Sequence, residues 1–301
     1  MSAPPIEVED LHVRYARASV EAVQGLSFSV APGEIVGFLG PNGAGKSSTL
    51  KTLMGFVQPS AGLCSLFGKA AGTPESRQGV GYLPEVALYY PYLTPHETLT
   101  LYGEIQGLKG SALKKETEAL LEAVGVSAAM RRQNRSLSKG MLQRVGIAQS
   151  LLGNPKLLIL DEVTSGLDPV GRQELRMLLK KRRDEGATLF FSSHELAEVD
   201  MLCDRILLIN KGRLIEERQM DMLKDELRDY TLTYSGDAVM LGLTDDWNQV
   251  SDRTRTARFR TKENLLKGID KVNQSGGEIL DIVAQEGSLE NYFIAKVGGA
   301  S

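Results

Sequence analysis

The run Gly-Pro-Asn-Gly-Ala-Gly-Lys-Ser-Ser at residues 40–48 has the composition and spacing of a loop that binds phosphate. It fits the pattern G-x-x-x-x-G-K-[ST], in which glycines let successive backbone N–H groups turn toward phosphate oxygens. The ammonium group of Lys46 can reach the β- and γ-phosphates of a nucleotide, and the hydroxyl of Ser47 can bind Mg²⁺. An apolar run precedes the loop and a helical pattern follows it, as this motif requires. We therefore predict a nucleotide-binding P-loop made of Gly40, Pro41, Asn42, Gly43, Ala44, Gly45, Lys46, Ser47 and Ser48.

Two acidic residues, Asp161 and Glu162, end the apolar run at residues 157–160. Such a run predicts a buried strand that carries both carboxylates to one edge of a sheet. There Asp161 can lie beside a metal ion, and Glu162 can orient or deprotonate an attacking water. Together with the P-loop, these acids predict hydrolysis of a nucleotide. The guanine-binding motif N-K-x-D is not met at residues 210–213, which disfavours a GTPase.

The hydrophobic pattern predicts the elements that position these residues. Apolar runs at residues 34–39 and 157–160 alternate with helical patterns, which is typical of an α/β fold with a mainly parallel sheet. The fold class predicted is therefore a P-loop NTPase core. Thr94, followed by Pro95 and by Glu97 as a capping-box partner, starts a helical stretch. We expect residues of about 91–152 to form a helical subdomain inserted into the sheet domain.

The character of the sequence changes near Tyr230. From there the pattern predicts two edge-like strands, a helix, a further strand and a final helix. We therefore expect a nucleotide-binding domain over residues 1–229 and a small α+β accessory domain over residues 230–301.

Composition limits the classes of function. The 301 residues are 42% hydrophobic and 24% charged, which excludes a disordered chain. The net charge is -3, so there is no basic excess to hold nucleic acid, and we expect no nucleic-acid partner. The two cysteines, Cys64 and Cys203, suit a reducing cytosol better than a disulfide-held secreted protein. The apolar runs are far shorter than the roughly 20 residues that span a bilayer, so any membrane-spanning part belongs to another chain.

Three further motifs follow the P-loop: Leu-Ser-Lys-Gly-Met at 137–141, Thr-Ser-Gly-Leu-Asp-Pro at 164–169 and Ser-Ser-His at 192–194. Together with the P-loop and the two acids, in this order, they resemble the ATP-binding-cassette (ABC) transporter ATPases over about residues 5–225. The resemblance implies an ATP-hydrolysing subunit that uses ATP and Mg²⁺ and drives substrate movement through a separate membrane permease. It also implies a cytoplasmic location, on the inner face of the plasma membrane through that permease.

The resemblance assigns roles across a dimer. In this family two ATPase domains meet head to tail and enclose two ATP molecules. Ser138 and Gly140 would then contact the γ-phosphate of ATP bound to a second subunit, either an identical chain or a close paralogue. Ser138 also fits a helix N-cap, and the two roles are compatible. His194 corresponds to a switch histidine at the γ-phosphate, and Asp168 to an aspartate that crosses the interface, although an aspartate before proline is also a common turn residue.

The resemblance assigns three more features. Tyr15 corresponds to the aromatic residue that stacks on adenine, with plain packing as the alternative. Glu85 corresponds to a residue that orients water around Mg²⁺. Tyr89, Tyr90 and Tyr92 lie where a permease helix docks in this family, although packing of the helical subdomain explains them equally well.

The sequence departs from the common family pattern in three places. The signature is LSKGM where many members have LSGGQ, Glu85 replaces glutamine and Val163 replaces proline. LSKGM and this glutamate resemble the exporter branch, and the C-terminal run EGSLENYFIAKV resembles an accessory domain of that branch. The sequence disfavours two other classes of protein. An ABC ATPase acting on nucleic acid or the ribosome is disfavoured by the single cassette and balanced charge, and a non-hydrolysing adaptor is disfavoured by intact Lys46, Asp161 and Glu162.

Overall fold

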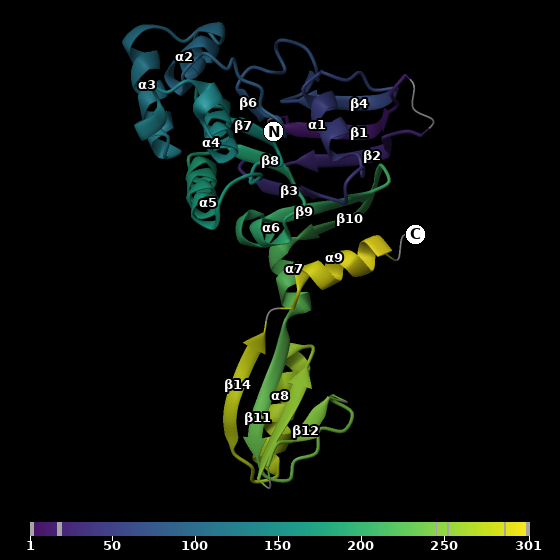
Figure 1. Cartoon of the computed structure of the whole chain (residues 1–301). Coiled ribbons are helices and arrows are strands. Elements are labelled where there is room, and N and C mark those ends of the chain that lie inside the picture. Colours follow the sequence, from purple (N-terminus) through teal and green to yellow (C-terminus); the bar gives the residue numbers. More distant parts are fainter. Residues whose placement is uncertain (1–2, 17–19, 245, 252, 286, 299–301) are drawn as a thin grey trace. The chain divides into compact units, whose positions relative to one another are not determined.

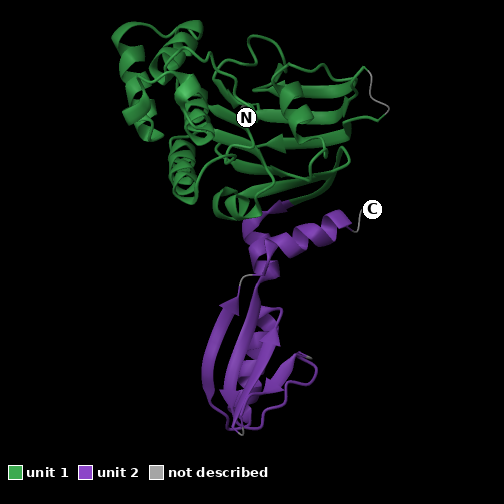
Figure 2. Cartoon of the chain, in the orientation of Figure 1, with its two compact units in different colours: residues 1–217, 300–301 green, residues 218–299 purple. Residues whose placement is uncertain are grey.

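The structure is a computed structural model that describes residues 3–16, 20–244, 246–251, 253–285 and 287–298. The chain divides into two compact units, of which the first ends at Glu217 and the second begins at Arg218 (Figure 2). Helix α7 (Met220–Leu227) therefore lies in the second unit, whereas the sequence prediction assigned residues up to 229 to the first domain. The functional domains 1–229 and 230–301 stay a prediction.

The first unit is built on a six-stranded sheet with the order β10-β9-β3-β8-β7-β6 (Figure 1). The pairs β3–β8, β3–β9, β7–β8 and β6–β7 are parallel, so the prediction of a mainly parallel sheet is confirmed. Every residue of β3, β7, β8 and β9 is buried, as expected when helices or another sheet cover both faces. The strands are β3 (Ile35–Leu39), β6 (Val80–Leu83), β7 (Leu157–Asp161), β8 (Thr188–Ser193), β9 (Arg205–Asn210) and β10 (Arg213–Gln219).

A second sheet in this unit is antiparallel, with the order β2-β1-β4-β5. The sequence predicted strands in this region but not that they form a sheet of their own. The rings of Phe28, Phe38 and Phe190 come from both sheets, and their centroids lie 5.2–5.8 Å apart, so they join the two sheets in one core. The strands are β1 (Ile6–Val13), β2 (Val23–Val30), β4 (Ala61–Leu66) and β5 (Lys69–Ala70).

Helices α2 (Pro95–Ile105), α3 (Gly110–Ala123) and α4 (Lys139–Ser150) lie together at one end of this unit, with the short helices η1 (Ser127–Ala129) and η2 (Asn134–Ser136) between α3 and α4 (Figure 1). The predicted capping box is present at the start of α2. The hydroxyl of Thr94 accepts from the N–H of Glu97 at 3.2 Å, and the Thr94 N–H donates to the Glu97 carboxylate at 2.8 Å. Helices α1 (Lys46–Leu53), α5 (Pro169–Asp184) and α6 (Leu196–Leu202) complete the unit.

The three tyrosines before α2 differ in their surroundings. The ring of Tyr89 packs edge-on against Tyr102, and its hydroxyl donates to Gln149, so this residue packs against the helical region. The side chains of Tyr90 and Tyr92 are 65% and 67% exposed. The packing alternative therefore applies to Tyr89, while the other two form part of the surface.

The second unit contains a four-stranded antiparallel sheet with the order β12-β13-β11-β14, and helix α8 (Lys262–Gln274) packs on it. Its core includes Tyr234, Phe259 and Val272, which are all fully buried. The predicted α+β character of the C-terminal region is confirmed. The other elements are β11 (Asp229–Ser235), β12 (Trp247–Gln249), β13 (Thr254–Phe259), β14 (Ile279–Gln285) and α9 (Leu289–Gly298). Among the described residues, no helix has both the length and the apolar character needed to cross a bilayer.

Candidate active site

The P-loop connects β3 to α1, and two of its glycines are required by close backbone approach. A Cβ atom on Gly40 would lie 2.4 Å from the carbonyl oxygen of Ile209. One on Gly45, which has φ +109°, would lie 2.5 Å from the carbonyl oxygen of Ala22. The loop borders a hollow of about 450 Å³. Its lining consists of Ala22, Asn42, Gly43, Ala44, Gly45, Lys46, Ser47, Ser48, Glu85 and Glu162.

Lys46 lines this hollow and is only 7% exposed. Its ammonium group donates to the carbonyl oxygen of Gly40 at 2.6 Å and to that of Pro41 at 3.3 Å. Burial lowers the pKa of Lys46, and the negative charge of Glu162 opposes this shift. The ammonium Nζ also lies 3.9 Å from Glu162 Oε1, so the P-loop lysine forms an ion pair with the predicted base.

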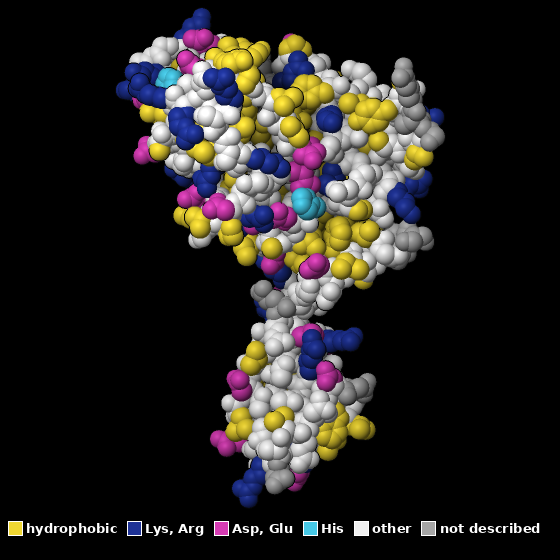
Figure 3. Space-filling model, in the orientation of Figure 1, with side chains coloured by type: hydrophobic (Ala, Val, Ile, Leu, Met, Phe, Trp, Pro, Cys, Tyr) yellow, Lys and Arg dark blue, Asp and Glu magenta, His cyan; other side chains and the backbone are white. Residues whose placement is uncertain are grey.

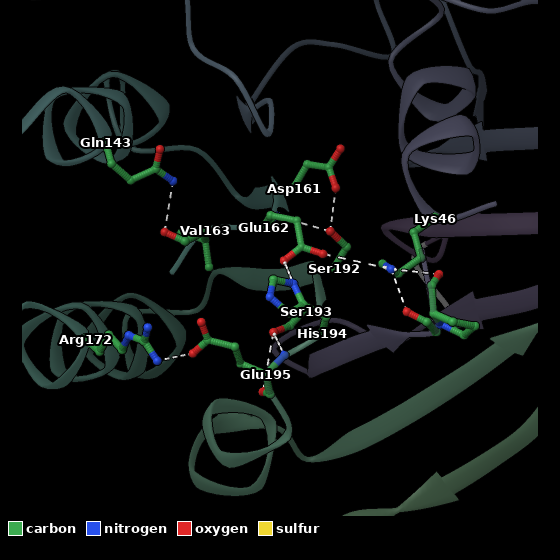
Figure 4. A network of polar contacts seen from close by, with 12 residues as sticks. Lys46, Gln143, Asp161, Glu162, Val163, Arg172, Ser192, Ser193, His194 and Glu195 are labelled. Atoms are coloured by element: carbon green, nitrogen blue, oxygen red, sulfur yellow. Dashed lines mark hydrogen bonds and ion pairs between the residues drawn. The ribbon is translucent and has the colours of Figure 1, made fainter. Parts of the chain in front are cut away.

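The two acids lie at the carboxyl end of β7, as predicted. Asp161 is 1% exposed and Glu162 is 8% exposed. The backbone of Glu162 has φ +50°, in the left-handed region that residues other than glycine seldom adopt. This conformation turns the chain sharply after the strand. The Glu162 carboxylate consequently lies at the P-loop hollow, while Asp161 is held by the neighbouring strand β8 (Figure 4).

His194 follows directly after β8, and its ring meets the same carboxylate. The distance from His194 Nδ1 to Glu162 Oε2 is 2.6 Å, and the histidine side chain is 57% exposed. Glu162 therefore lies between His194 and Lys46, with one carboxylate oxygen toward each (Figure 4). In the space-filling view, acidic side chains adjoin a histidine near the middle of the visible face of the first unit (Figure 3).

Ser47 and Glu85 line the hollow, whereas Asp161 lies next to Glu162 in the chain, is buried and is bonded to Ser192. The hydroxyl of Ser47 and the carboxylates of Asp161 and Glu85 are oxygen donors, which Mg²⁺ prefers. Within the described ranges, no group of three or more His, Cys, Asp and Glu side chains is arranged to hold a metal ion.

The predicted adenine contact, Tyr15, lies beside the P-loop. Its hydroxyl is 3.1 Å from the hydroxyl of Ser48, and the residue is 41% exposed. An exposed ring at the edge of the phosphate site is available to a ligand, but the stacking role itself stays a prediction.

The residues predicted to act across a dimer do not line the hollow of their own chain. Ser138 caps α4 by accepting from the Met141 N–H at 3.2 Å, and Asp168 caps α5 by accepting from the Gly171 N–H at 3.1 Å. A Cβ atom on Gly140 would lie 2.6 Å from the carbonyl oxygen of Gly166, so only glycine fits there. The capping role stated for Ser138 is thus present, and Asp168, for which a turn role was the alternative, is also a helix N-cap. Both positions remain compatible with a second role.

Two buried polar residues in the site were not foreseen. Ser192 is fully buried and contacts both acids, and the side chain of Gln143 in α4 donates to the carbonyl oxygen of Val163 at 3.0 Å. For Ser192 the available signal was a polar residue in a mostly apolar strand, whereas Gln143, in a helix with other polar residues, carried no such signal. The structure shows what such residues hold, namely the segment that follows β7.

Comparison with known proteins places the chain in a family. A family profile described as ABC transporter matches residues 23–165. The chain is also 38% identical to an uncharacterised ABC transporter ATP-binding protein of Nostoc sp., over 92% of this chain and 84% of that protein. The chain belongs to the ABC transporter ATP-binding proteins. It is the ATP-binding subunit of an ABC transporter and carries the ATPase domain of that family.

Other ABC proteins match between 71% and 98% of this chain. The bacitracin transport ATP-binding protein BcrA of Bacillus licheniformis is 35% identical, over 98% of each chain. The Nod factor export ATP-binding protein I of Ralstonia nicotianae is 37% identical, over 72% of this chain and 67% of that protein. A solved ABC cassette, described as dimeric in a post-hydrolysis state with ADP and Pi, has a TM-score of 0.67 at 21% identity and covers 71% of this chain and 98% of its own. At that identity the likeness concerns the fold.

Proposed function

We propose that this ABC subunit hydrolyses ATP at the P-loop hollow, with Glu162 as the general base and Lys46 and His194 as the groups that stabilise the transferred phosphate. The observation that carries the proposal is the position of the Glu162 carboxylate, which lies 3.9 Å from Lys46 and 2.6 Å from His194 at the mouth of the loop. A base must lie near the attacking water, and the stabilising charges must lie near the phosphate.

Electrostatics supports Mg²⁺ as the cofactor. Three carboxylates, from Glu85, Asp161 and Glu162, lie around the buried ammonium of Lys46, and the phosphates of ATP bring further negative charge. Ser47 and Asp161 would hold the ion, and Glu85 would orient its water. When bound, the cation would neutralise charge on the phosphate oxygens and so make the γ-phosphorus more susceptible to attack by water.

The residues of the site divide the chemical work. The phosphate oxygens of ATP accept hydrogen bonds from the backbone N–H groups of the P-loop. Their negative charge also attracts the ammonium of Lys46 away from Glu162. The Glu162 carboxylate is then free to accept a proton from water, while its hydrogen bond to His194 keeps it oriented. Because Nδ1 of His194 is engaged by Glu162, this ring would donate to the phosphate through Nε2, and the Lys46 ammonium would donate to it as well, as charge develops there.

A second subunit completes the proposed site. Ser138, Gly140 and Asp168 lie outside the hollow of their own chain, and Ser138 stands at the N-terminus of α4, where helix N–H groups favour anions. In the proposed dimer, this end of α4 faces the γ-phosphate bound to the other subunit, Asp168 crosses the interface, and Tyr15 stacks on adenine. The partner is a second copy of this chain or a close paralogue.

The membrane partner proposed is a separate permease, and the direction proposed is export. Support comes from the names of two relatives, which describe bacitracin transport and Nod factor export, and from the LSKGM signature. A permease helix would dock on the exposed side chains that follow Glu85. These are Val86, Leu88, Tyr90 and Tyr92. This partner would hold the subunit at the cytoplasmic face of the membrane.

One purification tests this function. We expect the tagged chain, taken from detergent-solubilised membranes, to bring an integral membrane protein with it and to release phosphate from ATP when Mg²⁺ is present. The matched variant Lys46→Ala should retain the membrane protein but bind ATP weakly and release little phosphate. Nucleic acid in place of a membrane protein, or equal phosphate release by the variant, would contradict the proposal.

A further inference from the structure

Ser192 is bonded to both acids at the end of β7. It is fully buried, and its hydroxyl accepts a hydrogen bond from the backbone N–H of Glu162 at 3.0 Å. The same hydroxyl donates to Asp161 Oδ1 at 2.5 Å. Strand pairing makes this possible, because Asp161 and Ser192 are register partners in the parallel pair β7–β8 (Figure 4).

The chemistry of a hydroxyl makes these two bonds interdependent. Serine has one O–H donor and two acceptor lone pairs. Because the single donor is directed at the Asp161 carboxylate, a lone pair is left for the Glu162 N–H. A bond to a charged acceptor is also stronger than one between neutral groups, so Asp161 fixes the rotation of the hydroxyl.

The bond to Glu162 acts on a strained residue. With φ +50°, Glu162 has a backbone conformation that is unfavourable for a residue with a side chain and persists only when its surroundings enforce it. The hydroxyl of Ser192 secures the N–H of this residue, and its carbonyl oxygen accepts from the Ser165 N–H at 3.0 Å. These two bonds set the direction in which the Glu162 side chain leaves the backbone.

We propose that Ser192 is a positioning residue for hydrolysis: by holding the Glu162 N–H, it aims the Glu162 carboxylate at the attacking water. The inference rests on the proposed role of Glu162 as the base. Ser192 is fully buried and would act through Glu162.

The neighbouring serine provides a matched control. Ser193 is 1% exposed and lies on the same strand. Its hydroxyl accepts from the Glu195 N–H at 2.9 Å and donates to the Glu195 carbonyl oxygen at 3.4 Å, away from both acids. Ser192→Ala and Ser193→Ala therefore remove the same buried group, but only the first loosens Glu162.

The first measurement separates kcat from ATP binding in the preparation that hydrolyses ATP. We expect Ser192→Ala to lower kcat by about 10- to 100-fold, the range for a lost hydrogen bond in a charged network, with KM within about threefold of the wild type. Ser193→Ala should keep kcat within about twofold. If Ser192→Ala folds poorly, Ser192→Cys, whose thiol is a weak donor and acceptor, should show the same loss of kcat.

A double-mutant cycle decides whether Ser192 acts through Glu162. Adding Ser192→Ala to Glu162→Gln should cause no further loss of kcat, because the base that Ser192 aims is already absent. Losses that multiply, or a normal kcat for Ser192→Ala beside an inactive Glu162→Gln, would overturn this inference alone. A near-normal kcat for Glu162→Gln itself would instead overturn the proposed base, so the two failures are distinguishable.

Discussion

At the scale of single residues, the site depends on one carboxylate held from several directions. Glu162 contacts His194 and Lys46 through its side chain and Ser192 through its backbone. Lys46 is the first residue of α1, whereas Ser192 lies in β8 and His194 directly follows that strand. A charged group that is 8% exposed is seldom held so closely without a task that needs a fixed direction.

Replacement of this carboxylate by an amide tests its role. Glu162→Gln keeps the shape of the side chain but removes the basic oxygen, so we expect turnover to fall by roughly 10²–10⁴-fold while ATP still binds. Steady-state phosphate release and calorimetric ATP titration measure the two effects. Glu185→Gln, an acid at the end of α5 that pairs with Arg182, should leave turnover unchanged. Turnover close to the wild type in Glu162→Gln would exclude the assigned role.

At this scale the sequence predicted which residues form the site better than it predicted the hydrogen bonds between them. The P-loop and the acids after β7 were predictable because each motif is a short stretch whose spacing carries its own chemistry. The Ser192 bonds were not, because they depend on the register that pairs β8 with β7, thirty-one positions apart between Asp161 and Ser192. Hydrophobic pattern alone does not specify register between two strands buried on both faces.

At the scale of elements, local patterns predicted helix starts well. The capping box at α2 is present with both of its hydrogen bonds, because it needs only residues within one turn. The separate antiparallel sheet of β1, β2, β4 and β5 was not predicted, since the alternation in β1 and β2 indicates strands but not their partners. The core formed by Phe28, Phe38 and Phe190 explains why the two sheets pack together.

The cap at α2 gives a prediction about stability. Thr94→Ala should lower the free energy of unfolding by about 1 kcal/mol, because the Glu97 N–H loses its acceptor. Urea unfolding measures the change. Thr100→Ala is the control, since its hydroxyl donates to the His96 carbonyl oxygen within the same helix and caps nothing. An equal loss of unfolding free energy in both variants would show that the capping hydrogen bond adds no stability beyond that of an ordinary threonine hydroxyl in this helix.

The same cap makes this difference depend on pH. The backbone hydrogen bond from Thr94 lowers the pKa of Glu97 from its ordinary value of 4.5. A lowered pKa means that the bond stabilises the fold above pH 4.5 and that this contribution is lost as the pH falls through the folded-state value. Thr94→Ala keeps this backbone bond but removes the hydroxyl that also donates to the Glu97 carboxylate at 2.9 Å and is the second cause of its lowered pKa. The stability difference between the wild type and Thr94→Ala should therefore narrow in acid. A gap that widens as the pH falls would contradict this reasoning.

At the scale of the whole molecule, the proposed site requires a second chain. The order of the five motifs identified the family, and the comparisons confirm it. Yet Ser138, Gly140 and Asp168 lie outside the hollow that Lys46 and Glu162 share in one chain. ATP bound between two subunits would bring both groups to one phosphate, and its hydrolysis would remove the γ-phosphate that joins them. This cycle of closing and opening is the motion that a permease could use.

If ATP joins two subunits, the molecular mass of Glu162→Gln in solution should depend on the bound nucleotide. This variant binds ATP without splitting it, so light scattering on a sizing column should show a dimer with ATP and Mg²⁺ and a monomer with ADP. Ser138→Arg, which places a bulky side chain at the N-terminus of α4, should bind ATP and remain monomeric. A monomer of Glu162→Gln saturated with ATP, both alone and with its membrane partner supplied, would contradict the account.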